Sequence, residues 1–252
     1  MAGVPPAFVD CHSHVLPSGD DGAKTIEEGL SLCAGAAEHG TRILYATPHV
    51  WPHLPLTAER EQSIRANFEE LRAHAPLELR LGFELTPTEA LLAEDLTRYA
   101  LDGTVAVLIE LHFVGDEALL VACCSRAAAA GLVPVIAHPE RTEAVQRRPA
   151  LAQQLADRGH LLQVNATSLL GYHGEEAEDL GWSIVEDGLA ALVGSDGHRA
   201  ARPPHLDDAF ARAREKLGEE AALPLFDGSA LGLAPPASPP RRLPSRAGAR
   251  AA

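Results

Sequence analysis

The chain has 252 residues, with 21 Lys and Arg against 35 Asp and Glu, so its formal net charge is −14. This length suffices for one large domain or two small ones. The acidic balance excludes a general nucleic-acid binder, which needs clustered Lys and Arg, and it also disfavours binding to an anionic membrane surface. The first residues lack an export signal, and no apolar stretch reaches about 18 residues. We therefore expect a cytoplasmic protein that is not inserted in a membrane.

Apolar strands alternate with helical patterns along the chain. The expected strands are Phe8–Cys11, Ile43–Ala46, Leu77–Leu85, Val105–Leu111, Val133–Ala137, Leu161–Asn165 and Ala191–Gly194. The expected helices are Thr25–His39, Ala58–His74, Thr88–Tyr99, Asp116–Ala130, Ala144–Arg158, Glu175–Asp187 and Leu206–Leu217. Such alternation predicts parallel βαβ units. No linker or repeat interrupts it, so the pattern predicts an α/β fold with a single barrel-like domain over residues 1–233.

The last residues, 234–252, have a different composition. They contain five prolines, four arginines and no acidic residue. This composition predicts a disordered, solvated tail rich in Pro, Arg and Ala. Its positive charge leaves contact with an acidic partner or a nucleic acid as the alternative.

The four cysteines form no CxxC pair and no disulfide framework. We expect Cys11, Cys33, Cys123 and Cys124 to be small buried side chains in a reducing compartment.

Side chains that can bind metal ions follow almost every expected strand. In a βα barrel the active site is built where the strands end, so these side chains are expected to meet at one mouth. They occur at six of the seven strand ends, as Asp10-Cys11-His12-Ser13-His14 with Asp20-Asp21, His49, Glu84, Glu110, His138 and Asp196-Gly197-His198.

Each of these residues has an ordinary explanation when it is taken alone. A His-x-His pair is a moderate signal, and a buried histidine such as His138 is more often hydrogen-bonded in a core. Glu110 is harder to explain, because it ends an apolar strand where an unpaired carboxylate is severely destabilising. The coincidence at six strand ends favours a metal centre.

The number of candidate ligands exceeds what one ion needs. Zinc usually takes about four ligands, and nine mixed nitrogen and oxygen ligands suit two or three divalent ions. No thiolate is required, so Mn, Fe and Zn all remain possible. The candidates are His12, His14, Asp21, His49, Glu84, Glu110, His138, Asp196 and His198.

Two arginines stand beside these candidates. Arg141 follows His138 by three residues, and Arg202 follows His198 by four. Metal clusters activate water and clamp the oxygens of a displacement at phosphorus, and arginine matches phosphate oxygens. The combination favours phosphoester hydrolysis, with carbon–nitrogen bond hydrolysis as the main competitor and solvated surface arginines as the ordinary explanation.

The sequence does not decide the role of three further residues. His112 is a candidate for substrate contact because it is close to Glu110 on the same strand. Trp51 and Tyr172 are candidates for an apolar wall near the site, with packing in the core or on the surface as the alternative.

These motifs together carry a family resemblance over about residues 8–215. The chain resembles the polymerase and histidinol phosphatase (PHP) superfamily, and within it the bacterial tyrosine-protein phosphatases of capsule and exopolysaccharide biosynthesis. The segments that carry the resemblance are His12-Ser13-His14-Val15-Leu16-Pro17, Asp20-Asp21-Gly22-Ala23-Lys24, Ala46-Thr47-Pro48-His49 and Ala137-His138-Pro139-Glu140-Arg141.

The resemblance implies a distorted TIM-like (β/α)7 barrel with a trinuclear metal site, most often manganese. It implies that the nine candidates named above are the ligands, and that Arg141, Arg202 and His198 are catalytic. A hydroxide activated by the metals would hydrolyse phosphotyrosine. The implied substrate is the Tyr-phosphorylated tail of a membrane-associated tyrosine autokinase that regulates polysaccharide export.

The chain departs from the family pattern at a few positions. Leu111 and His112 follow Glu110 where an aromatic residue and Pro are usual, and Gly197 stands where Ala is usual. These departures concern substrate identity more than hydrolysis. The alternatives are a small-molecule phosphomonoesterase such as histidinol phosphatase, a non-catalytic binding module, and a nuclease, which the acidic charge disfavours.

Overall fold

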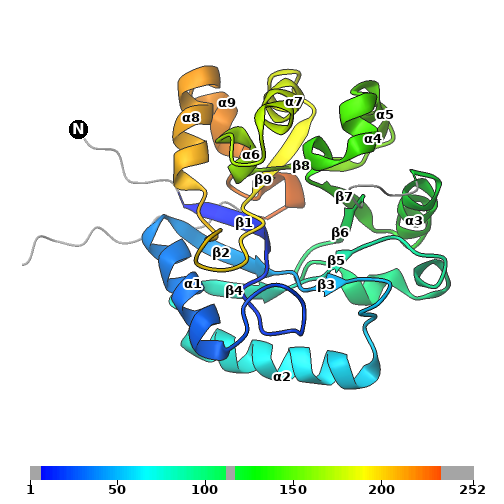
Figure 1. Ribbon diagram of the computed structural model, residues 1–252, viewed down its shortest axis with the longest axis vertical. Coiled ribbons are helices and arrows are strands. Elements are labelled where there is room, and N and C mark those ends of the chain that lie inside the picture. Colours follow the sequence, from blue (N-terminus) through cyan, green and yellow to red (C-terminus); the bar gives the residue numbers. More distant parts are fainter. Residues whose placement is uncertain (1–6, 112–116, 234–252) are drawn as a thin grey trace, which may run out of the picture.

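A computed structural model describes residues 7–111 and 117–233. Strands run through the middle of the molecule, and helices surround them (Figure 1). The strands are β1 (Phe8–Ser13), β2 (Thr41–Ala46), β3 (His49–Val50), β4 (Glu78–Leu81), β5 (Glu84–Leu85), β6 (Ala106–Glu110), β7 (Val133–Ala137), β8 (Leu161–Asn165) and β9 (Ala190–Gly194). The α-helices are α1 (Ile26–Glu38), α2 (Ala58–His74), α3 (Glu117–Ala129), α4 (Glu143–Arg147), α5 (Ala150–Asp157), α6 (Ala166–Leu169), α7 (Glu175–Glu186), α8 (Asp207–Leu217) and α9 (Glu219–Ala222).

All strand pairs between these elements are parallel. One sheet has the order β1-β2-β4, and the other has the order β3-β5-β6-β7-β8-β9. The edge strands β1 and β9 of the two sheets are also connected. The Asp196 N–H donates to His12 O over 2.9 Å, and the His14 N–H donates to Gly197 O over 2.6 Å. These bonds join the end of β1 to the segment after β9. The fold is therefore a single-domain α/β fold whose strand ends lie together.

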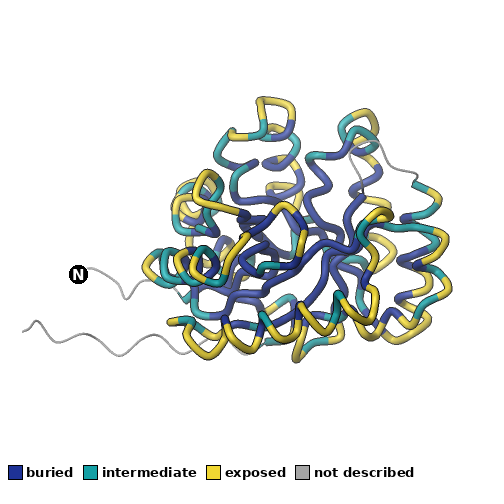
Figure 2. Tube along the Cα trace, turned by 60° about the horizontal axis from the view of Figure 1, so that its bottom comes forward, coloured by how far each residue is buried: buried dark blue, intermediate teal, exposed yellow. Residues whose placement is uncertain are grey.

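Apolar side chains fill two layers because successive strand residues point to opposite faces. The inner layer contains Val9 and Cys11 of β1, Tyr45 of β2 and Leu108 of β6. The outer layer packs the opposite strand faces against the helices and holds most of the buried apolar residues. Figure 2 shows the strands as buried and the outer helix faces as exposed. The inner layer lies directly below the carboxyl ends of the strands, where the polar side chains are located.

Local sequence signals explain where several elements begin and end. Thr25 and Thr57 cap helices α1 and α2 by accepting hydrogen bonds from the amides of Glu28 and Arg60. The expected helix 144–158 is instead two helices, α4 and α5, because Pro149 disfavours helical backbone in the residue before it.

Two other expected elements are also divided. The expected strand Leu77–Leu85 is two strands, β4 and β5, in different sheets. The break falls at Gly82, where a Cβ atom would lie 2.3 Å from Leu101 Cδ2. The expected helix 88–99 consists of two short 3-10 turns, Leu91–Ala93 and Leu96–Tyr99.

Some expectations fall outside the described residues, and others are confirmed. His112 and the tail 234–252 lie outside them. All four cysteines are free and buried, as predicted. Within residues 7–111 and 117–233, no helix is both long and apolar enough to cross a membrane.

Replacing a side chain of the inner layer should destabilise the whole domain. Leu108 is fully buried, so Leu108→Ala is expected to lower the free energy of unfolding by about 2–5 kcal/mol. Val105, three residues earlier, is 59% exposed, and Val105→Ala should change the free energy of unfolding by less than about 0.5 kcal/mol. Urea denaturation of both variants measures the difference. Equal losses would contradict the two-layer description.

Candidate metal centre

All nine side chains predicted to be metal ligands meet at the carboxyl ends of the strands. Groups of them place one nitrogen or oxygen atom each within 4.8 Å of one another. A cavity of about 300 Å³ opens above them. The described residues that line this cavity are Asp21, His49, Trp51, Pro52, His53, Glu110, His138, Arg141, Asp196 and His198.

Glu84 lies at the centre of this cluster and is fully buried. Its Oε2 atom lies 2.9 Å from His49 Nδ1, 3.1 Å from His12 Nε2 and 3.2 Å from His14 Nε2. Its Oε1 atom lies 3.0 Å from His138 Nε2. Four imidazoles, two from the end of β1 and one each from the segments after β2 and β7, therefore surround one carboxylate.

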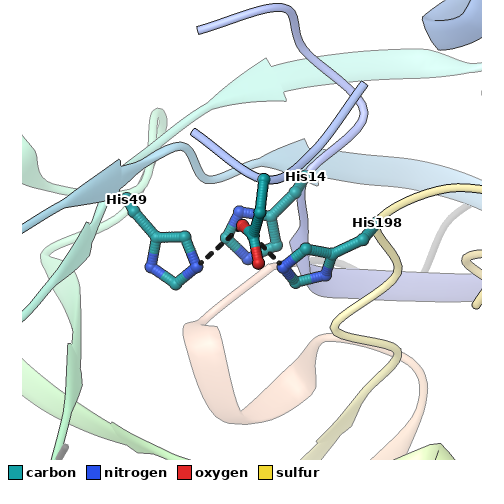
Figure 3. A group of neighbouring side chains, drawn as sticks. His14, His49 and His198 are labelled. Atoms are coloured by element: carbon teal, nitrogen blue, oxygen red, sulfur yellow. Dashed lines mark ion pairs between the residues drawn. The ribbon is translucent and has the colours of Figure 1, made fainter. Parts of the chain in front are cut away.

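Asp21 completes a second group, closer to solvent. Figure 3 shows the rings of His14, His49 and His198 converging from three segments of the chain. Asp21 Oδ1 lies 3.2 Å from His198 Nε2 and 3.6 Å from His49 Nε2. The side chain of Asp21 is 58% exposed, unlike the other members of the group, so it lies at the entrance of the site.

The donor set fits divalent metal ions. Two ligand atoms at about 2.1 Å from one ion, and about 90–110° apart, are about 3.0–3.4 Å from each other. The distances around Glu84 Oε2 fall close to this range. Moreover, Glu84 Oε2 and His49 Nδ1 are buried, yet neither has a hydrogen-bond partner among the described residues. Atoms that approach one another without hydrogen-bond geometry are arranged like ligands of a shared cation.

Two of the predicted ligands have left-handed backbone conformations. His138 has φ +34° and Asp196 has φ +49°, and they are the two described non-glycine residues with positive φ. Such conformations cost about 1–3 kcal/mol each and persist when the surroundings impose them. Both residues directly follow or nearly follow a strand, so the backbone turns there and directs the side chains into the cluster.

Hydrogen bonds set the orientation of two histidine rings. His12 Nδ1 lies 2.8 Å from Gln163 Oε1, and His198 Nδ1 lies 2.9 Å from the backbone oxygen of Asp196. His198 Nδ1 also contacts the guanidinium of Arg202, which only donates hydrogen bonds. For His12 the oxygen of Gln163 is the acceptor, so Nδ1 of His12 carries the proton and its Nε2 presents a lone pair to the cluster. This protonation state is the one that a metal ligand requires.

The amide chain behind His12 was not predicted from the sequence. Gln163 Nε2 donates to Asn165 Oδ1 over 2.9 Å, and Asn165 Nδ2 donates to Asp196 Oδ2 over 2.9 Å. Both amides lie on β8, which corresponds to Leu161–Asn165, the one expected strand with no candidate ligand at its end. Their alternation, with Val164 facing the outer layer, was the signal that two polar side chains point inward.

Asp20, the neighbour of Asp21, also has a supporting role that the sequence did not distinguish. Its carboxylate accepts hydrogen bonds from the amides of Gly22 and His49, both over 3.0 Å, and lies 3.6 Å from His14 Nδ1. It is buried and thus fixes the loop that carries Asp21.

Charges inside the cluster determine its protonation. Burial alone would raise the pKa of Glu84, but the surrounding imidazoles of His12, His49 and His138 hold it well below its usual range. Burial opposes ionisation of Asp196 too, and nearby histidines and Arg202 hold its pKa well below normal. Both carboxylates are therefore anionic at neutral pH.

The two predicted arginines lie on either side of Asp196. Arg141 Nη1 lies 2.7 Å from Asp196 Oδ2, and Arg202 Nη1 lies 3.7 Å from the same atom. Arg202 also contacts the ring of His198. Arg141 lines the cavity above the cluster, whereas Arg202 lines an adjoining cavity of about 400 Å³.

The fold and site define an α/β protein with a cluster of candidate metal-binding side chains at its parallel strand ends. The family model described as "Capsular polysaccharide synthesis, CpsB/CapC" matches residues 8–231. The chain belongs to this family.

Individual relatives agree with this assignment. The tyrosine-protein phosphatase YwqE of Bacillus subtilis is 29% identical over 89% of this chain and 91% of its own length. CpsB of Streptococcus agalactiae is 28% identical over 87% of this chain and 95% of its own length.

Solved structures give the same result. A crystal structure from a study of YwqE and Streptococcus pneumoniae CpsB, described as metal-dependent tyrosine phosphatases, has a TM-score of 0.75. It is 25% identical and covers 86% of this chain and 91% of its own. A dihydropyrimidinase from Brevibacillus agri, 14% identical with a TM-score of 0.57, covers 89% of this chain and 70% of its own, and shares the fold.

Removing the amide that orients His12 should weaken metal binding. Gln163→Leu leaves His12 Nδ1 without its acceptor, and loss of such a partner typically lowers metal affinity by about 10–100-fold. Titration calorimetry of metal-free protein with Mn²⁺ measures this change. Gln153→Leu, on the exposed face of α5, is the matched control and should bind as the wild type does. Unchanged affinity in Gln163→Leu would contradict the role of the amide chain.

Proposed function

We propose that the chain is a metal-dependent protein-tyrosine phosphatase, a phosphoric monoester hydrolase of capsule or exopolysaccharide synthesis. The observation that carries the proposal is the cluster of five histidines and four carboxylates, all buried except Asp21, below a cavity that Arg141 lines. The names of the relatives, which are tyrosine-protein phosphatases, support the same activity.

The nine clustered side chains would hold two or three divalent ions, and we propose Mn²⁺ as the ion, with Fe and Zn as alternatives. The oxygen and nitrogen donors without thiolate support this choice. Bound ions would supply a water of lowered pKa and positive charge for the phosphoryl oxygens. We further propose that the two sheets together form a distorted (β/α)7 barrel, which the hydrogen bonds between β1 and the segment after β9 support.

The chain's own residues would bind and orient the phosphate. Arg141 reaches into the cavity, and its planar guanidinium can donate two parallel hydrogen bonds to phosphate oxygens. Arg202 holds His198 and Asp196 from the adjoining side. His198 lines the cavity and would contact the reacting group at its entrance. Hydrolysis breaks the bond between phosphorus and the phenolic oxygen, and water provides the new oxygen.

The proposed substrate is a Tyr-phosphorylated protein, with a membrane-associated tyrosine autokinase as the partner. The proposed location is the cytoplasm, where such a kinase tail would lie. A net charge of −14 does not oppose an anionic substrate, because the metal ions concentrate positive charge at the site.

Removal of the metal or of one central ligand should abolish turnover. We expect chelation, or His138→Ala, to reduce hydrolysis of p-nitrophenyl phosphate and of a phosphotyrosine peptide by at least about 100-fold. Re-addition of Mn²⁺ should restore the chelated protein. His74→Ala, exposed at the end of α2, is the control and should keep full activity. A fully metallated protein that hydrolyses neither substrate would disprove the proposal, and a strong preference for small phosphomonoesters would favour a small-molecule phosphatase.

Alkylation of cysteines should leave the activity unchanged. All four thiols are buried, and burial raises the pKa of Cys33 to about 12 and that of Cys123 to about 11. Thiolates are the reactive species, so none is available as a nucleophile at neutral pH. Rates of p-nitrophenyl phosphate hydrolysis before and after iodoacetamide treatment of the native protein test this. Rapid inactivation with modification of one thiol would instead indicate cysteine catalysis.

A further inference from the structure

One wall of the cavity is chemically unlike the rest. Eight of the ten described lining residues are titratable or charged, and the two exceptions, Trp51 and Pro52, are adjacent in the sequence. Among the described lining residues, these two therefore offer the wall that is best suited to an apolar part of a bound substrate. The cavity volume of about 300 Å³ leaves room beside a phosphate for a larger group.

Trp51 is packed directly against the metal-ligand cluster. Its ring lies 4.1 Å from the ring of His49 at an interplanar angle of 24°, and the His49 ring lies 4.3 Å from that of His14 at the same angle. On the outer side, the Trp51 ring lies 5.2 Å from that of His53. The indole thus continues a series of stacked rings from the buried ligands to the rim. This position brings an aromatic surface beside the place where the phosphate would be held.

The segment that carries Trp51 is held in place before any ligand binds. The Leu54 N–H donates to Trp51 O over 3.0 Å and closes a tight turn. Arg60 of α2 donates to the backbone oxygens of His49 and Leu54, over 2.8 and 2.9 Å, and to that of Ser18 over 3.1 Å. With its backbone held and its ring stacked between those of His49 and His53, Trp51 loses little conformational entropy on binding, so it can discriminate between ligands by shape.

From these observations we propose that Trp51 is the specificity-determining residue that recognises the aromatic ring of an aryl phosphate. This inference rests on the proposed phosphatase function. Contact with the indole would favour phosphotyrosine over phosphoserine and phosphothreonine, because their short alkyl groups would not reach the Trp51 ring. Aromatic pairs contribute enough beyond apolar burial to account for up to about a tenfold preference.

The test compares binding of two non-hydrolysable phosphonates to the Mn²⁺-loaded protein by titration calorimetry. Benzylphosphonate presents a ring, whereas methylphosphonate presents only the anion. We expect Trp51→Ala to weaken benzylphosphonate about tenfold and to change methylphosphonate less than about twofold. Trp51→Phe should retain most of the affinity for benzylphosphonate. Tyr172→Ala, which removes an aromatic side chain that is 74% exposed and outside this cavity, is the matched control.

The outcomes separate this inference from the proposed function. Equal weakening of both phosphonates by Trp51→Ala would mean that the indole only supports His49, and it would overturn the inference. Unchanged binding of benzylphosphonate would overturn it as well. Because the readout is binding, a protein that failed to hydrolyse phosphotyrosine could still show the aryl preference. A parallel rate comparison should show a larger loss of kcat/KM for a phosphotyrosine peptide than for trifluoroethyl phosphate.

Discussion

The burial of one carboxylate among four imidazoles is the constraint on which the rest of this structure depends. Glu84 has no access to water, and a lone buried charge of this kind would be strongly destabilising. Its neighbours come from the ends of β1, β2 and β7, so the strands must end in register to satisfy it. The same requirement is consistent with the left-handed backbone of His138 and Asp196 and with the hydrogen-bonded amides behind His12 and Asp196. Folding and metal binding are therefore expected to be coupled.

The fold could be predicted from the sequence to the level of element order. Alternation of apolar strands with helical segments gave the parallel arrangement, and helix α2 has the predicted bounds, Ala58–His74. Breaks inside elements were missed where one residue decides the outcome. Pro149 divides an amphipathic helix, and close packing on Leu101 at Gly82 divides an apolar strand. Hydrophobic periodicity is an average over several residues, so it does not reveal a break that a single residue causes.

The candidate site was predicted more completely than the fold, because its residues lie at strand ends. All nine proposed ligands meet, and both arginines lie beside them, although their roles as ligands and phosphate contacts remain predictions. Gln163 and Asn165 were missed because an amide inside an apolar strand resembles an isolated polar residue. The role of Gln163 can be recognised only when the structure places the ring of His12 beside it. Trp51 was left undecided for the same reason, since a single aromatic residue has no periodicity.

Gly197 makes two loops depend on each other. A Cβ atom at this position would lie 2.6 Å from the backbone nitrogen and Cα of Pro204. The strand-end loop and the loop around Pro204 therefore approach each other more closely here than alanine would permit. Arg202 belongs to that second loop and reaches Asp196 across this narrow contact. With alanine at position 197 the second loop would have to lie farther out, so the size of this one residue sets how far Arg202 reaches toward Asp196.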